Sequence, residues 1–126
     1  MASDRIVLSV PARGEYARTV RLTAAELASR MGMSIDDIDD VRIAVEEAFA
    51  LASEHAGANG EVTFTFTLHE DAFEAVGTTP SATCEGPGDE ETGSRYARFI
   101  LESVSDEFEL KLEGGQCFIR LLKRVS

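Results

Sequence analysis

Residues 41–68 read VRIAVEEAFALASEHAGANGEVTFTFTL, and the spacing of their apolar residues changes halfway along. In the first half the apolar residues recur every three or four positions, which predicts an amphipathic helix. Its expected buried stripe is Ile38, Val41, Val45, Ala48, Phe49 and Ala52. From Val62 to Leu68 the apolar residues alternate with threonines, which is typical of a half-buried strand. The stretch therefore predicts a helix that is followed, across a glycine-containing break at 57–60, by sheet.

Further strands and helices are expected on both sides of this stretch. They are a strand at 6–10, a helix at 13–31, the second helix from 34 to 55, strands at 62–68 and 73–79, a loop at 80–93, a third helix at 96–104, and strands at 107–113 and 117–125. Because short turns join most of these strands, the sheet is expected to be antiparallel, with the helices on one face. The predicted fold class is α+β, a two-layer α/β sandwich.

Composition limits the kinds of partner that the chain can have. Its 126 residues fit one domain spanning 1–126. The count of 23 Asp and Glu against 12 Lys and Arg gives a net charge of -11, which argues against direct nucleic-acid binding and favours a basic protein or a cationic ligand. Two isolated cysteines without a CxxC motif predict no metal site. No signal peptide and no apolar span of about 20 residues is found, which predicts a cytoplasmic protein without a membrane partner.

Glu47 is the residue of this segment that could carry chemistry. It falls off the buried stripe of the second helix, on a second face expected to include Ile43, Leu51 and Glu54. A carboxylate there would lie at the rim of a pocket between the helices and the sheet. The spacing alone leaves open that Glu47 and its acidic neighbours are solvated helix charges.

The segment 41–55, together with the helix opening Glu15-Tyr16-Ala17-Arg18, resembles the RsbW/SpoIIAB family of anti-sigma factors. These are small cytosolic serine kinases with the GHKL-type ATP-binding fold of histidine kinases. The family's segment reads like Arg-(Leu/Ile)-Ala-Val-x-Glu-Ala-x-x-Asn-Ala-x-x-His. The matching residues here are Arg42, Ile43, Ala44, Val45, Glu47, Ala48, Ala52 and His55. The likeness is strong over about residues 13–55, and the element order covers nearly the whole chain.

The resemblance implies a role for several residues and also marks departures from the family. Glu47 matches the general base, and Arg18 matches a position that contacts partner proteins. The family's asparagine that holds Mg²⁺ falls on Leu51, and its adenine-reading aspartate should follow the strand near Gly77. The glycine-rich lid keeps only Gly93 before the third helix. The cofactor-binding positions Leu51, Gly77 and Gly93 are thus degenerate, and ATP and Mg²⁺ are expected only if this site still works.

The expected function is that of an anti-sigma-factor-like regulator in a bacterial stress response. It would sequester an alternative sigma factor by protein–protein binding, without ATP, and release it to a STAS-type anti-sigma antagonist. The resemblance also implies a homodimer that forms through the region of the first strand and helix. Two alternatives stay open: an active ATP-dependent serine-protein kinase of the same family, and a sensor domain that binds a small ligand.

Overall fold

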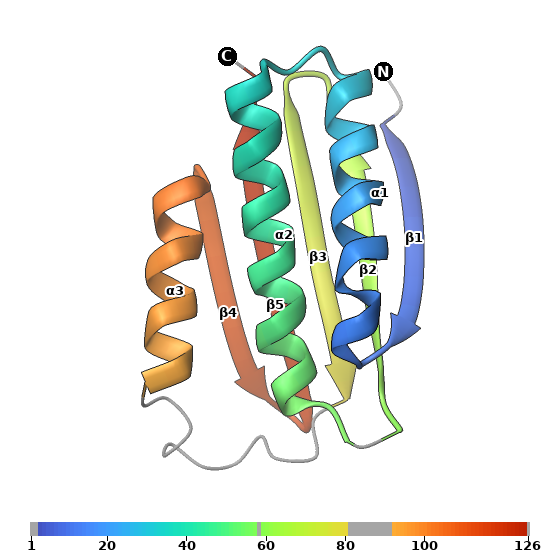
Figure 1. Ribbon diagram of the computed structural model, residues 1–126, viewed down its shortest axis with the longest axis vertical. Helices are drawn as coiled ribbons and strands as arrows, with labels where there is room; N and C mark the ends of the chain where they lie inside the picture. Colours follow the sequence, from blue (N-terminus) through green and yellow to red (C-terminus); the bar gives the residue numbers. More distant parts are fainter. Residues whose placement is uncertain (1–2, 58, 81–91, 126) are drawn as a thin grey trace.

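A computed structural model describes residues 3–57, 59–80 and 92–125, and in this part of the chain three α-helices cover one face of a five-stranded sheet (Figure 1). The strands are β1 (Asp4–Pro11), β2 (Glu61–Leu68), β3 (Ala72–Pro80), β4 (Glu107–Glu113) and β5 (Gln116–Arg124). The helices are α1 (Ala17–Arg30), α2 (Ile35–His55) and α3 (Thr92–Val104), with a short 3₁₀ turn at Gly14–Tyr16. The strand order is β1-β2-β3-β5-β4, and every neighbouring pair is antiparallel. The predicted α+β two-layer sandwich is confirmed.

Local signals fix the ends of these elements. The Ser34 hydroxyl accepts a hydrogen bond of 3.1 Å from the backbone N–H of Asp37, which caps the start of α2. Gly114 and Gly115 have φ angles of +64° and +72°, as a two-residue hairpin turn between β4 and β5 requires.

The expected loop at 80–93 is shorter at both ends than predicted. Strand β3 runs to Pro80, which pairs with Gln116 of β5, and the Thr79 hydroxyl donates a 2.7 Å hydrogen bond to the carbonyl of Glu61. Helix α3 begins at Thr92, four residues before the predicted start. The remainder of the predicted loop, 81–91, lies outside the described residues.

The hydrophobic core lies between the sheet and the helices. Phe64, Phe66 and Phe73 are buried there, with ring centroids 5.6 Å apart for the first two and 5.8 Å apart for the second two. Burying each ring contributes roughly 2–3 kcal/mol. Helix α2 is the central helix, with α1 on one side and α3 on the other (Figure 1). This arrangement sets the long axis of α2 over β3 and β5.

An ion pair beneath α2 holds its first turns on the sheet. The Lys123 ammonium of β5 lies 3.1 Å from a carboxylate oxygen of Asp40 and 3.8 Å from one of Asp37. The Lys123 side chain is only 15% exposed, so water screens this pair less than a surface pair. Within the described residues, no helix combines the length and the apolar character needed to cross a membrane.

Candidate functional site

Glu47 lies on the flank of α2 that carries Asp40. The two residues are seven apart, so two helical turns place them on the same side, and Asp40 reaches down to Lys123 on β5. The Glu47 side chain is half-buried. Burial raises the pKa of the Glu47 carboxyl above its ordinary value, and the carboxylates of Glu46 and Glu54 raise it further. A carboxyl in this setting is suited to accept a proton, as a general base does.

Leu51, one helical turn after Glu47, does not share its surroundings. Its side chain is 1% exposed and belongs to the hydrophobic core. The expectation that Leu51 lies off the buried stripe, on a second face with Glu47, is therefore wrong. The physical reason is that a central helix with neighbours on both sides buries a wider arc than one with a single neighbour. The position where the resemblance implies a metal-holding asparagine is a core position in this chain.

Gly77 is buried in β3 and leaves no room for a side chain. It pairs with Phe64 of β2, and a Cβ added at Gly77 would lie 2.9 Å from Cε1 of the Phe64 ring. The ring fills the space that a carboxylate at this position would need. Position 77 thus lacks the acid that the resemblance implies, and the apolar ring of Phe64 lies against it.

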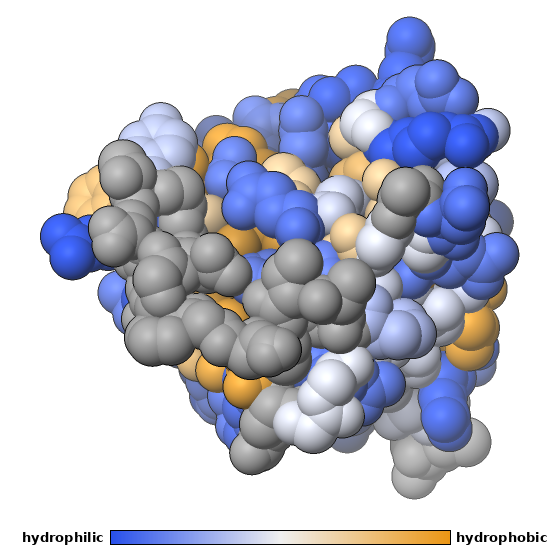
Figure 2. Space-filling model, turned by 90° about the horizontal axis from the view of Figure 1, so that it is seen from below, coloured by the Kyte–Doolittle hydropathy of each residue, from blue (hydrophilic) through white to orange (hydrophobic). Residues whose placement is uncertain are grey.

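Gly93 lies in the first turn of α3, and the aromatic side chain of Tyr96 follows in the next turn at 65% exposure. Phe99 is also exposed, at 67%. Seen from below, the end of the molecule where α2 finishes and α3 begins shows apolar surface among hydrophilic side chains (Figure 2). Glu47 and Leu51 thus lie on the central helix α2, Gly77 lies on the central strand β3, and Gly93 lies on α3.

These residues do not fit a bound ATP·Mg²⁺. Mg²⁺ takes oxygen ligands in octahedral geometry, and the buried Leu51 has none to offer. Gly77 supplies no carboxylate for a purine amino group, and the ring of Phe64 lies against it. Glu47 retains its carboxyl, but a general base cannot transfer a phosphoryl group without a bound nucleotide.

Arg18 is exposed on α1, on the opposite side of α2 from the Glu47 flank. Among the described residues no ion pair involves its guanidinium, whereas Arg21, three residues further, lies 3.1 Å from Glu46 of α2. The Arg18 guanidinium is thus available at the surface.

A cavity of about 280 Å³ between α1 and α2 was not foreseen from the sequence. It is lined by Arg21, Asp39, Arg42, Ile43 and Glu46. Arg42 lies 3.1 Å from Asp39, and the buried Nε of Arg21 has no hydrogen-bond partner among the described residues. Arg42 and Asp39 pair within α2, three residues apart, whereas the pairing of Arg21 with Glu46 depends on how α1 crosses α2, which the spacing within one helix does not give.

Comparisons with known proteins agree with this fold. A model of the histidine kinase-like ATPase domain matches residues 10–117. The serine-protein kinase RsbW of Bacillus licheniformis is 32% identical over 132 residues, which cover 90% of this chain and 82% of that protein. RsbW of Bacillus subtilis strain 168 is 44% identical over 77 residues, which cover 59% of this chain and 48% of that protein. The chain thus matches about half the length of that relative.

Solved structures show the same fold at low sequence identity. The RsbU and RsbW domains of a Mycobacterium tuberculosis protein match 97% of this chain with a TM-score of 0.72 at 18% identity, and 32% of that chain is covered. A histidine kinase domain from Erythrobacter litoralis matches 92% of this chain with a TM-score of 0.56 at 14% identity, and 62% of that chain is covered. The family model and the B. licheniformis relative together lead to one conclusion. The chain belongs to the histidine kinase-like ATPase family, among its RsbW-like members.

Proposed function

We propose that this chain sequesters an alternative sigma factor by protein–protein binding and does so without binding ATP. The observation that carries the proposal is the chemistry at positions 51 and 77. Leu51 is buried in the core and Gly77 lies against the Phe64 ring, so neither offers the oxygen atoms that Mg²⁺ and adenine would need. Binding a protein partner requires none of these groups, because it depends on the exposed surface of the helices.

Charge supports a protein partner on the helix side. The chain carries a net charge of -11, yet its segment 13–30 has four arginines and two glutamates. Three of the arginines are paired with a carboxylate, namely Arg13, Arg21 and Arg30. Arg18 alone among the four is exposed without such a pair in the described part of the chain. An arginine that is not already neutralised by its own chain is the one best placed to pair with a partner.

Sequestration follows from two electrostatic effects. The acidic chain attracts the basic patches of a sigma factor over long range, which speeds the encounter. The positive charge of α1 differs in sign from the net charge of the chain, and this difference fixes the orientation of the complex. A STAS-type antagonist that binds the same surface would release the sigma factor by competition, at a concentration set by the two affinities. Sigma factors act in the cytoplasm, and we propose that compartment for this chain.

Nucleotide binding is tested first, by calorimetry with ATP and Mg²⁺. We expect no binding tighter than about 10 μM, which corresponds to roughly -7 kcal/mol. Tighter binding would contradict the proposal, since it would show that the cleft still recruits the nucleotide despite Leu51 and Gly77.

Partner binding is tested with purified alternative sigma factors from the same genome. We expect one of them to bind, and Arg18→Ala to weaken that binding at least tenfold, or about 1.4 kcal/mol. Arg30→Ala is the matched control, because it removes the same charge from the same helix at an arginine that is paired with Glu26. Equal losses in both variants would indicate general electrostatics rather than a contact at Arg18. Unchanged binding in Arg18→Ala would show that α1 is not the contact surface.

One observation favours a second candidate, an active serine-protein kinase. Glu47 keeps a half-buried carboxyl with a raised pKa at the family's general-base position. If the purified chain transfers phosphate from ATP to a serine of a STAS-type antagonist, and Glu47→Gln abolishes the transfer, the kinase function replaces sequestration without ATP.

A further inference from the structure

The cavity between α1 and α2 shares no residue with the positions that the family resemblance assigns to the nucleotide. One wall comes from α1 and the other from α2, which lies beside it (Figure 1). Because both walls are regular helices, the lining side chains start from fixed positions. The volume of about 280 Å³ is at the lower end of the range of about 300–1,000 Å³ for ligand sites, so the cavity suits a small molecule.

The charged groups of the lining balance one another. Nη1 of Arg21 lies 3.1 Å from Oε1 of Glu46, and Nη1 of Arg42 lies 3.1 Å from Oδ1 of Asp39. The lining therefore has a net charge of zero, although the whole chain has a net charge of -11. A simple anion or cation would meet a repelling group beside each attracting one. A ligand that carries one charge of each sign matches the lining.

Both arginines keep donors that could hold a carboxylate. Each makes one hydrogen bond to its acidic partner, although a guanidinium has five N–H donors arranged for two parallel bonds. The buried Nε of Arg21 has no hydrogen-bond partner among the described residues. A buried donor without an acceptor is unfavourable, and turning this edge of the guanidinium toward a ligand breaks no hydrogen bond at Nε. The arginines therefore favour a carboxylate as the negative group of the ligand.

The acidic side chains of the lining could hold an ammonium group. In the described part of the chain, Asp39 and Glu46 each use one carboxylate oxygen for the paired arginine, so the second oxygen of each can accept from a ligand. The opposite charges of each pair lie close together, so a complementary ligand needs its own opposite charges close together. An α-amino acid meets this need, because its ammonium and carboxylate groups are attached to the same carbon atom. Peptide bonds consume both groups, so the lining favours a free amino acid over a segment of protein.

Ile43 gives the cavity an apolar side. It is 45% exposed, so an aliphatic group that covers it would remove apolar surface from water. From the balanced charges, the unused donors and this apolar side, we propose that the cavity between α1 and α2 binds a free aliphatic α-amino acid. Arg21 and Arg42 hold the carboxylate, Asp39 and Glu46 hold the ammonium, and the aliphatic side chain covers Ile43. The inference does not depend on the proposed function, since it involves neither a sigma factor nor a nucleotide.

Calorimetry with L-leucine at concentrations up to about 20 mM tests the proposal. We expect a dissociation constant below about 1 mM. Two analogues test the need for both charges. 4-Methylpentanoate is leucine without its ammonium group, and 3-methylbutylamine is leucine without its carboxylate. Each should bind at least tenfold more weakly than leucine, because it leaves one sign of the lining without a partner.

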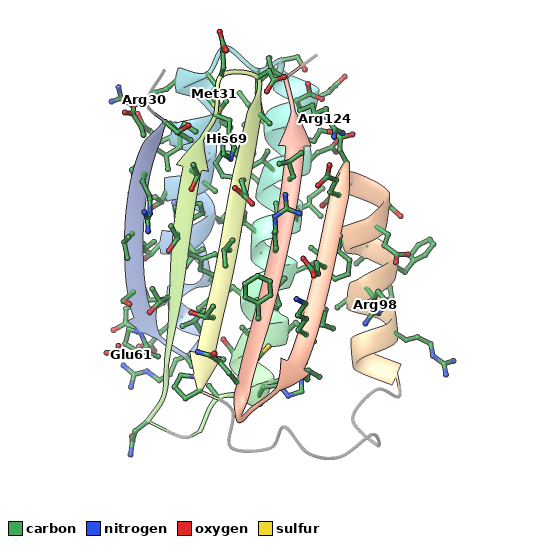
Figure 3. The ribbon with its side chains drawn as sticks, turned by 180° about the vertical axis from the view of Figure 1, so that it is seen from behind. Arg30, Met31, Glu61, His69, Arg98 and Arg124 are labelled. Carbon is green, nitrogen blue, oxygen red and sulfur yellow. The ribbon has the colours of Figure 1, made fainter. Side chains whose placement is uncertain are left out.

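Variants of the two arginines locate the site. Arg21→Gln and Arg42→Gln should each weaken leucine binding at least tenfold, because each removes a carboxylate-binding group. Arg30→Gln is the matched control, since it removes the same charge from α1 and breaks a similar ion pair, with Glu26. Figure 3 shows Arg30 at the end of α1, pointing away from the molecule, and it does not line the cavity. Circular dichroism and thermal unfolding establish that each variant is folded, and Arg42→Gln serves if Arg21→Gln is not.

Several results would overturn the proposal. One is a parent chain that does not bind leucine at 20 mM. Another is 4-methylpentanoate binding as tightly as leucine, which would make the cavity a site for simple anions. Leucine binding that survives both cavity variants would place the ligand elsewhere. An equal loss in Arg30→Gln would indicate general electrostatics rather than a contact in the cavity.

Discussion

Replacing Leu51 with asparagine introduces the residue type that the family resemblance implies at this position, and the structure predicts a large loss of stability. Leu51 is 1% exposed, so the change removes a fully buried leucine, which contributes about 1.5–3 kcal/mol. The amide that replaces it must be buried as well, and a buried amide whose hydrogen bonds are not satisfied costs about 1–3 kcal/mol. The free energy of unfolding should therefore fall by roughly 3–5 kcal/mol. For a chain of this size the melting temperature falls by roughly 10–20 °C.

Urea unfolding followed by circular dichroism measures this loss. The midpoint should fall while the slope of the free energy against urea stays unchanged, since the surface exposed on unfolding is the same. Ala50→Asn is the matched control, because Ala50 is exposed on the same helical turn, and an asparagine there costs only its helix propensity of about 0.7 kcal/mol at most.

A small effect at position 51 would refute the reasoning. If Leu51→Asn costs less than about 1 kcal/mol, the side chain reaches water and the position lines an open cleft. If the same variant also gains micromolar affinity for ATP and Mg²⁺, the cleft is a nucleotide site that lacks only one ligand.

Two further changes test the same region. Gly77→Asp should destabilise the chain by about 3 kcal/mol or more, because its Cβ would press on the fully buried Phe64 ring and its carboxylate would be buried. It should not create nucleotide affinity. Urea unfolding measures the first effect and calorimetry the second, and a stable Gly77→Asp chain that binds ATP would contradict the prediction. Glu47 has a pKa that is raised in the folded chain, so the folded state binds more protons than the unfolded state, and stability falls as the pH rises through the folded pKa. Glu47→Gln should thus be more stable than the parent at pH 7, by less than about 1 kcal/mol because the carboxyl is only half-buried. This difference in stability should vanish below the ordinary carboxyl pKa. A variant that is less stable than the parent at pH 7 would show that the folded chain favours the charged form of Glu47.

Much of the fold was predictable because two strong local patterns agree with its global arrangement. The threonines at 63, 65 and 67 alternate with buried residues, and the register places them on the outer face. Gly114 and Gly115 fix the last hairpin through their positive φ angles. The early start of α3 was missed because its first turn, Thr92-Gly93-Ser94, has no apolar residue from which a helical period could be recognised.

The candidate site was only partly predictable. The helical spacing placed Glu47 off the buried stripe of α2, but it left open whether the side chain is solvated or half-buried. The burial of Leu51 depends on the neighbour on each side of α2, and the spacing within α2 carries no information about those neighbours. The contact between Gly77 and Phe64 depends on the register between β2 and β3, which the sequence of either strand alone does not determine. In both cases the missing information is a tertiary distance rather than a local preference.

Stability and partner binding should respond to different residues in this chain, because the residues that fill the core and those that face solvent do not overlap. Leu51 and Gly77 are buried, so changes there alter the fraction of folded molecules and leave the surface of each folded molecule as it was. Arg18 is exposed, so a change there leaves the core as it was. Losing the polar groups of a nucleotide site would thus cost the fold nothing, since a leucine in the core is more favourable than an unpaired amide. An RsbW-like chain can lose its nucleotide site and still bind its partner only if the partner surface does not depend on the nucleotide. The affinity of the sigma factor for this chain should then be the same with and without ATP.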